Sequence, residues 1–188
     1  AETFSLYGTA KDIVTKKDYK RTSDLKRDFE KNEKMTSHPY VKFQKARTYK
    51  LLLTNLRSPK VKKEYSDIIS NSFEEAIESI DFYYPYIKST KSYGAVLGMY
   101  GLFLSVNSKD HQRALRYLED AKDVYEKLRI KDKTYYTILN NLSNVYLMNY
   151  RIKNDDRYLK ELSLICQYVV NNSAEARKAG FNVSLYKK

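Results

Sequence analysis

Small and apolar residues return at helical spacing along this chain, most clearly between residues 111 and 121. There Ala114, Leu118 and Ala121 follow one another at steps of four and three residues, which places them on one face of a helix. The same steps occur at Ala76, Ile80 and Tyr83 and, more loosely, at Leu25, Phe29 and Asn32. A helical unit that repeats along a chain predicts stacked helix hairpins, an architecture that usually binds other molecules.

The scarcity of helix-breaking residues favours an all-α fold. Only 5 glycines and 3 prolines occur among 188 residues, fewer than the usual shares of about 7% and about 5%. With 42% hydrophobic residues, the chain has enough apolar surface to form a core. We therefore predict one all-α domain over residues 1–188, in which antiparallel helix pairs stack into a right-handed superhelical array with a concave face. The 19 tyrosines suit half-buried seams between such helices and also binding surfaces.

Apolar spacing, caps and breakers together predict about eight helices. They cover about residues 2–16, 22–33, 39–56, 60–84, 91–106, 111–129, 134–150 and 157–171. Ser72 and Glu75 form a capping-box sequence, so 60–84 fits either one long helix or two. A helical turn at about 174–179 stops at Gly180, a predicted C-cap, and 181–188 has strand or coil character. The expected organisation is an N-terminal pair at 1–34, repeat units at 39–85, 91–129 and 134–171, and a tail at 172–188.

Three glycines fall within one predicted helix. Gly94, Gly98 and Gly101 lie on or near one face of the helix expected over 91–106. Glycine destabilises a helix interior by about 1 kcal/mol relative to alanine, so their presence requires a structural reason. We predict that a neighbouring helix approaches this face closely.

The strongest repeat resembles the tetratricopeptide (TPR) family. Leu97, Tyr100, Gly101 and Leu104 resemble the first helix of a TPR unit, and Ala114, Leu118 and Ala121 resemble the second. A second match comprises Leu139, Leu142, Ser143 and Tyr146, followed by Leu162, Cys166 and Val169. Ala76 precedes Ala114 by 38 residues and Gly101 precedes Ser143 by 42, against about 34 in the family. The chain is therefore TPR-like, with longer loops or helices than the standard unit.

The resemblance implies a non-enzymatic scaffold or adaptor that holds a protein or peptide in an inner groove. Polar and aromatic residues on the first helix of each pair would line that groove, and asparagine amides there would bond the backbone of an extended peptide. The candidates are Tyr49, Asn55, Tyr93, Tyr100, Asn140, Asn141, Asn144 and Tyr146. The alternative is that these are ordinary surface and seam residues.

No catalytic or metal-binding arrangement is evident in the sequence. His38 and His111 are far apart, and each falls at a predicted turn or cap. The single cysteine, Cys166, lies in an apolar helical run and is most simply a small buried residue. There is no paired histidine or cysteine spacing typical of zinc and no glycine-rich phosphate loop. We therefore predict that the protein is not an enzyme and uses neither a cofactor nor a metal.

The positive charge is concentrated in the first third of the chain. Residues 1–63 contain 17 Lys and Arg against 7 Asp and Glu, whereas residues 64–188 contain 18 against 16. Such a field attracts nucleic acid, an anionic membrane surface or an acidic protein, although it also occurs on surfaces that only promote solubility. The candidate basic patch comprises Lys16, Lys17, Lys20, Arg21, Lys26, Arg27, Lys42, Lys45, Arg47 and Lys50. Nucleic-acid binding is the third functional alternative.

A different class of function also fits the sequence. TPR-like arrays occur as extracytoplasmic sensory domains of bacterial signalling proteins, ahead of a membrane helix and a diguanylate cyclase or histidine kinase. A start at Ala1 rather than at methionine would suit a processed or excised domain, which favours the bacterial periplasm over the cytoplasm. No stretch reaches the roughly 20 apolar residues of a membrane span. A structural homo-oligomer is a further option, and the sequence does not define the oligomeric state.

Overall fold

In the residues that the structure describes, the fold is all-α, as predicted. The computed structural model describes residues 22–35, 38–53, 56 and 58–186, and in these ranges it contains eight α-helices and no strand. Consecutive helices pack as antiparallel pairs. The chain forms two compact units, Ala1–Pro85 and Tyr86–Lys188, which are described separately. The helix predicted over 2–16 lies outside the described residues.

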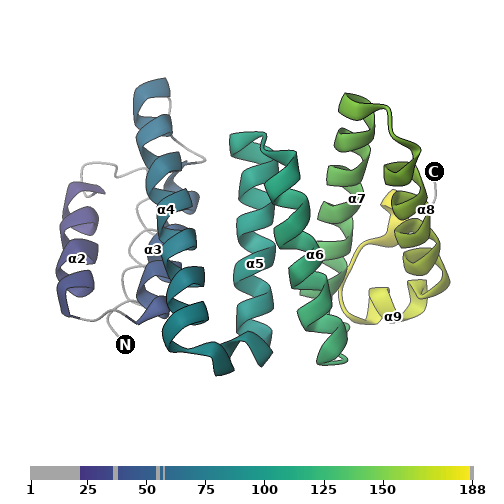
Figure 1. Ribbon diagram of the computed structural model, residues 1–188, viewed down its shortest axis with the longest axis horizontal. Coiled ribbons are helices and arrows are strands. Elements are labelled where there is room, and N and C mark those ends of the chain that lie inside the picture. Colours follow the sequence, from purple (N-terminus) through teal and green to yellow (C-terminus); the bar gives the residue numbers. More distant parts are fainter. Residues whose placement is uncertain (1–21, 36–37, 54–55, 57, 187–188) are drawn as a thin grey trace. The chain divides into compact units, whose positions relative to one another are not determined.

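The first unit contains the antiparallel pair α3 and α4 (Figure 1). Helix α2 spans Thr22–Met35, α3 spans Pro39–Leu53 and α4 spans Pro59–Tyr83. Pro39 and Pro59 open their helices, where a missing N–H group costs nothing. The core of this pair is formed by residues that are almost completely buried, among them Ala46, Leu52, Ile69, Phe73 and Ala76, and Leu25 and Phe29 of α2 are equally buried.

The capping-box sequence does not divide α4. Ser72 lies in the interior of one continuous helix and is only 3% exposed. The apolar face of α4 runs through Ile69, Phe73, Ala76 and Ile80, on both sides of this serine. Burial of that continuous face stabilises an unbroken helix and outweighs the local preference for a cap.

The second unit consists of two further hairpins and a short C-terminal helix (Figure 1). A 3₁₀ turn, η2, spans Pro85–Ser89 across the boundary between the units. Helix α5 spans Lys91–Phe103 and continues as a π-turn, η3, over Leu104–Ser108. Helices α6, α7 and α8 span His111–Lys127, Lys133–Lys153 and Asp156–Asn171. Each packs on the next, so that α5 pairs with α6 and α7 pairs with α8.

The three glycines of α5 lie against neighbouring helices, as predicted. A Cβ atom on Gly101 would lie 2.7 Å from Leu118 Cγ and 3.1 Å from the backbone oxygen of Ala114. On Gly94 it would lie 2.8 Å from the Tyr125 ring, and on Gly98 it would lie 3.0 Å from Ile138 Cγ1. Glycine suits this approach, because a Cβ atom at Gly94 or Gly101 would require neighbouring atoms of α6 to shift and one at Gly98 would be tightly packed against α7.

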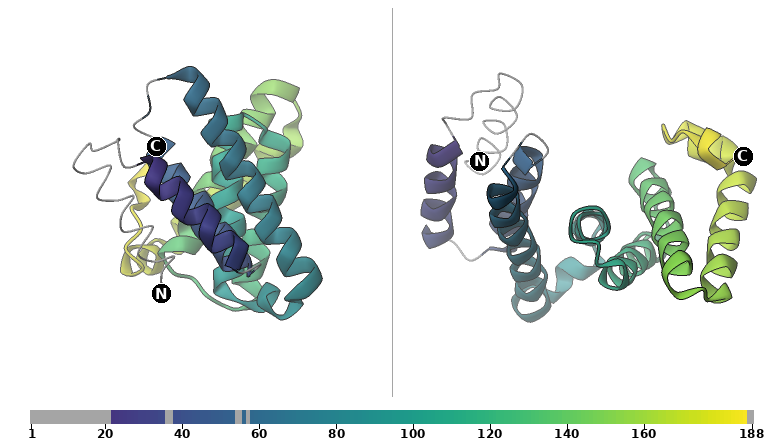
Figure 2. Two further views of the ribbon diagram at one scale, coloured as in Figure 1. Left: turned by 90° about the vertical axis from the view of Figure 1, so that its left-hand side faces the viewer. Right: turned by 90° about the horizontal axis from the view of Figure 1, so that it is seen from above.

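The chain after α8 turns back beside that helix (Figure 2). Helix α9 spans Ser173–Lys178, its C-cap residue is Ala179, one residue before the predicted C-cap, and Gly180 follows with φ 77°, the left-handed conformation that terminates a helix. The last described turn, η4, is a 3₁₀ helix over Val183–Tyr186. The strand alternative for this tail is therefore wrong, since residues 183–186 form a helical turn instead.

Candidate functional site

Four of the predicted groove residues lie on α7, namely Asn140, Asn141, Asn144 and the buried Tyr146. Asn140 and Asn141 are half-buried, and Asn144 is exposed. Asn144 lies four residues after Asn140 and three after Asn141, so the three amides form a contiguous patch on the helix surface. We call these three residues the asparagine row. The remaining candidates are dispersed, since Tyr49 belongs to the first unit and Asn55 lies outside the described residues.

The predicted groove tyrosines are core residues. Tyr49 is 1% exposed and Tyr100 is 0% exposed. The Tyr49 ring packs 4.9 Å from that of Tyr65, and the Tyr100 ring packs 4.7 Å from that of Tyr117. Neither ring lines a surface groove, and both fill the seams between paired helices. The sequence reveals the helical spacing of these tyrosines, but it does not show which face of each helix a neighbouring helix covers.

Tyr146 is also buried, but it is linked to the surface through a carboxylate. Its hydroxyl donates a 2.6 Å hydrogen bond to Glu119 Oε1 on α6. Burial, together with this bond and the charge of Glu119, raises the pKa of the Tyr146 phenol well above its usual range. The phenol therefore stays protonated and joins α7 to α6.

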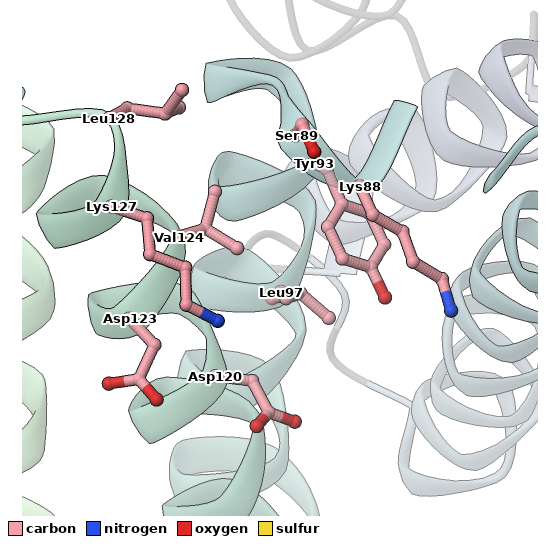
Figure 3. A pocket seen from close by; sticks show the side chains of 9 residues that line it. All are labelled: Lys88, Ser89, Tyr93, Leu97, Asp120, Asp123, Val124, Lys127 and Leu128. Atoms are coloured by element: carbon pink, nitrogen blue, oxygen red, sulfur yellow. The ribbon is translucent and has the colours of Figure 1, made fainter. Parts of the chain in front are cut away.

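A cavity lies between η2, α5 and α6 (Figure 3). It has a volume of about 450 Å³. Figure 3 shows Tyr93 beside Lys88 of η2 on one side of the cavity and the α6 residues Asp123, Val124 and Lys127 on the other. The lining residues are Lys88, Ser89, Tyr93, Leu97, Asp120, Asp123, Val124, Lys127 and Leu128. Tyr93, 9% exposed, is the only predicted groove residue among them.

Charges of both signs surround this cavity. Lys88 and Lys127 supply positive charge, and Asp120 and Asp123 supply negative charge. Asp123 lies 3.7 Å from the amine of Lys122, which also pairs with Glu126 at 3.2 Å. This mixture of charges would suit a ligand that carries both a positive and a negative group. It would also suit a peptide segment whose polar backbone lies next to a charged side chain. Sequence spacing missed the site because residues 88–97 meet residues 120–128 only after the hairpin closes.

The basic patch is partly engaged within the first unit. Lys42 pairs with Glu75 at 2.5 Å, and Arg47 donates to Gln44 Oε1 and lies over the Phe43 ring. Arg27 pairs with Asp24 at 2.9 Å. Burial lowers the pKa of the Lys50 amine. Lys42, Arg47 and Arg27 thus interact with neighbours in their own unit, while Lys16, Lys17, Lys20 and Arg21 lie outside the described residues.

The histidines and the cysteine form no common site. His38 lies in the first unit, where its Nδ1 accepts a 3.2 Å hydrogen bond from the Tyr40 N–H, and His111 begins α6. Burial raises the pKa of the half-buried Cys166 thiol, which disfavours a reactive thiolate. Within residues 22–186 as described, no group of three His, Cys, Asp or Glu side chains is placed to hold a metal ion.

Comparison with known proteins provides no relative for this fold. No protein-family model, curated protein or solved structure matches the chain. Of the helices in the described ranges, none is long and apolar enough to cross a membrane.

Proposed function

We propose that the protein is a non-enzymatic binding module of TPR-like type, whose helix pairs stack as a right-handed superhelix and present a groove to a peptide or protein segment. The asparagine row is the main observation that supports this proposal. Asn144 is exposed on α7, whereas Leu142 and Val145 beside it are fully buried. A firmly anchored helix thus displays the amides of Asn141 and Asn144, each of which offers both a donor and an acceptor to a peptide backbone.

The packing of the second unit supports this proposal. The α5 glycines allow close contact with α6, and the Tyr146–Glu119 hydrogen bond joins α6 to α7. A rigid scaffold lowers the entropic cost of binding, because the surface is already in its binding conformation. Mixed charge at the α5–α6 cavity gives a second polar surface that a peptide side chain could occupy.

Selection from a random peptide library tests this function directly. We expect saturable binding of selected peptides to the full chain, with Kd values in a range of roughly 1–100 μM, typical of a modest interface. Substitution of both Asn141→Ala and Asn144→Ala should weaken binding about tenfold, since at least one net hydrogen bond is lost. The melting temperature should stay unchanged, because Asn144 is exposed and Asn141 half-buried.

Gln167→Ala provides the matched control, because Gln167 is an exposed amide on α8 outside the row. If Asn141→Ala/Asn144→Ala leaves affinity untouched, the row is not the binding surface. If no library peptide binds the wild-type chain, the proposed function itself is wrong.

A second candidate function is recognition of a small ligand by a sensory domain. The α5–α6 cavity of about 450 Å³ falls within the range of small-molecule sites. Its two aspartates and two lysines would complement an amphoteric molecule. Free amino acids serve as probes in a thermal-shift screen, in which a ligand should raise the melting temperature of the wild type but not of Asp120→Asn/Asp123→Asn. If no amino acid raises the melting temperature of the wild type, the small-ligand function is wrong.

A further inference from the structure

The segment from Phe181 to Tyr186 is bound to α7 by side chains. The Phe181 ring stacks on Tyr136 with 5.8 Å between ring centroids and 27° between ring planes. Val183 is 6% exposed. The Tyr186 hydroxyl donates a hydrogen bond of 3.4 Å to Asn140 Oδ1. The segment thus contacts one of the amides in the asparagine row.

The chain reverses direction after α9, and this turn brings residues 181–186 against the surface of α7. Gly180 adopts φ 77°, and the Phe181 N–H donates to the backbone oxygen of Ala176 at 2.9 Å. This pattern is a helix-terminating turn that glycine makes possible. Farther on, Asn182 accepts a 3.0 Å hydrogen bond from the Ser184 N–H, which starts the η4 turn. The segment also packs on α8.

The covered surface of α7 continues into the uncovered one. Tyr136 and Asn140 are four residues apart and therefore lie on the same face of the helix. Asn144 is the next residue at this spacing, and its side chain is exposed. Burial raises the pKa of the Tyr186 phenol, so its hydroxyl keeps the proton that it donates. One continuous helix face thus already holds a short peptide segment of the same chain.

We propose that this face of α7, together with α8, is a peptide site that residues 181–186 occupy in cis. The inference rests on the proposed binding function and names its ligand class: a segment with an aromatic residue, an aliphatic residue two positions later and a tyrosine three positions after that. A partner peptide of this kind displaces the internal segment. The apparent affinity is the intrinsic affinity multiplied by the fraction of molecules in which the face is free.

Fluorescence anisotropy with a labelled peptide of residues 180–188 tests the proposal. The full-length variant Phe181→Ala/Tyr186→Ala removes both aromatic anchors from the internal segment. We expect the peptide to bind this variant saturably, and to bind the wild type at least about tenfold more weakly, because the tethered segment competes at a high effective concentration. Ser184→Ala is the control. Ser184 is exposed within the same segment, so this variant should bind the labelled peptide as weakly as the wild type does.

Adding Asn140→Ala to the double variant checks the location of binding. It should reduce peptide affinity, because Asn140 Oδ1 is the acceptor of the tyrosine hydroxyl. A peptide in which the Phe181 and Tyr186 equivalents are alanine should not bind.

Two results would overturn the proposal. In the first, the double variant keeps its helical circular dichroism but binds no peptide, so the segment is only a structural cap. In the second, the double variant loses its folded state, which means that the segment cannot be displaced from an intact face. If library peptides still bind the wild type through Asn141 and Asn144 in either case, the general binding function survives and only this inference fails.

Discussion

Gly101 shows how a single hydrogen atom in place of a side chain determines the distance between two helices. Its virtual Cβ would meet both Leu118 and the backbone oxygen of Ala114. The leucine side chain can rotate, but a helix carbonyl can move only if α6 moves with it. The glycine is retained at this point because close packing outweighs its low helix propensity.

Replacement of Gly101 by alanine should therefore destabilise the protein. Alanine gains about 1 kcal/mol in helix propensity, but overpacking of a tight core costs about 1–3 kcal/mol. We expect a net loss of about 1 kcal/mol, measured by urea denaturation followed by circular dichroism. Ser92→Ala on the exposed surface of α5 should change stability by less than about 0.5 kcal/mol. A stabilising effect of Gly101→Ala would mean that the helices are farther apart.

Tyr136 couples stability to alkaline pH. Burial, and then the charge of Glu175, raise the pKa of its phenol to about 12, compared with about 10 in an unfolded chain. Its contribution is complete below pH 10 and is lost as the pH rises toward 12, because the unfolded chain releases its proton first. Tyr136→Phe should flatten the decline of the urea midpoint between pH 10 and 12.

Tyr83→Phe is the control for this pH dependence, because Tyr83 is 77% exposed. Deprotonation of lysines affects both variants in the same way, so the difference between their pH profiles isolates Tyr136. Identical slopes for the two variants would show that Tyr136 ionises equally in the folded and unfolded states.

Helices α5, α6, α7 and α8 of the second unit begin at side-chain caps. Thr90, Asp110, Asp132 and Asp155 each accept a hydrogen bond from a backbone N–H in the first turn of the following helix. The helix starts predicted at about 111 and 134 follow Asp110 and Asp132, and aspartate ahead of an apolar helical pattern is a strong N-terminal signal. The sequence did not predict the π-turn after Phe103, since that turn depends on how α5 packs on α6.

Asp132 should be the most consequential cap. Its Oδ1 accepts from the N–H groups of Thr134 and Tyr135, and its Oδ2 lies 2.6 Å from the Lys91 amine. Asp132→Ala should lower the free energy of unfolding by about 1–2 kcal/mol, mostly from the cap, since an exposed ion pair adds little. Thermal unfolding measures this loss. Asp132→Ser keeps a capping oxygen and should recover most of it, and equal losses would exclude capping as the cause.

The effect of Asp132 should also depend on acid pH. Partial burial by itself raises the pKa of its carboxyl, but hydrogen bonds from Lys91, Tyr135 and Thr134 outweigh burial and lower the net pKa. Its contribution is present above the unfolded pKa of about 3.9 and is lost as the pH falls through the lower folded value. The difference between wild type and Asp132→Ala should therefore shrink below pH 4.

At the scale of the molecule, the boundary between the two compact units carries exposed aromatic residues. Phe82, Tyr83 and Tyr86 are 81%, 77% and 70% exposed. Brief chymotrypsin treatment should cleave first within residues 82–86, because exposed ends of helices open more readily than their cores. Mass spectrometry would identify the fragments. Serine at all three positions should slow this cleavage, and a first cut inside α6 or α7 would contradict the prediction.

The all-α class, the pairing of consecutive helices and the close approach at the α5 glycines could be predicted from the amino-acid sequence. These features follow from spacing, caps and side-chain size, which act within one or two helical turns. The tertiary structure alone decided that Tyr49 and Tyr100 are core residues, that α4 is unbroken, and that 88–97 and 120–128 enclose a cavity. It also decided that residues 181–186 cover Asn140. Such features depend on which helix face a neighbour buries, and this is settled by packing between residues distant in sequence.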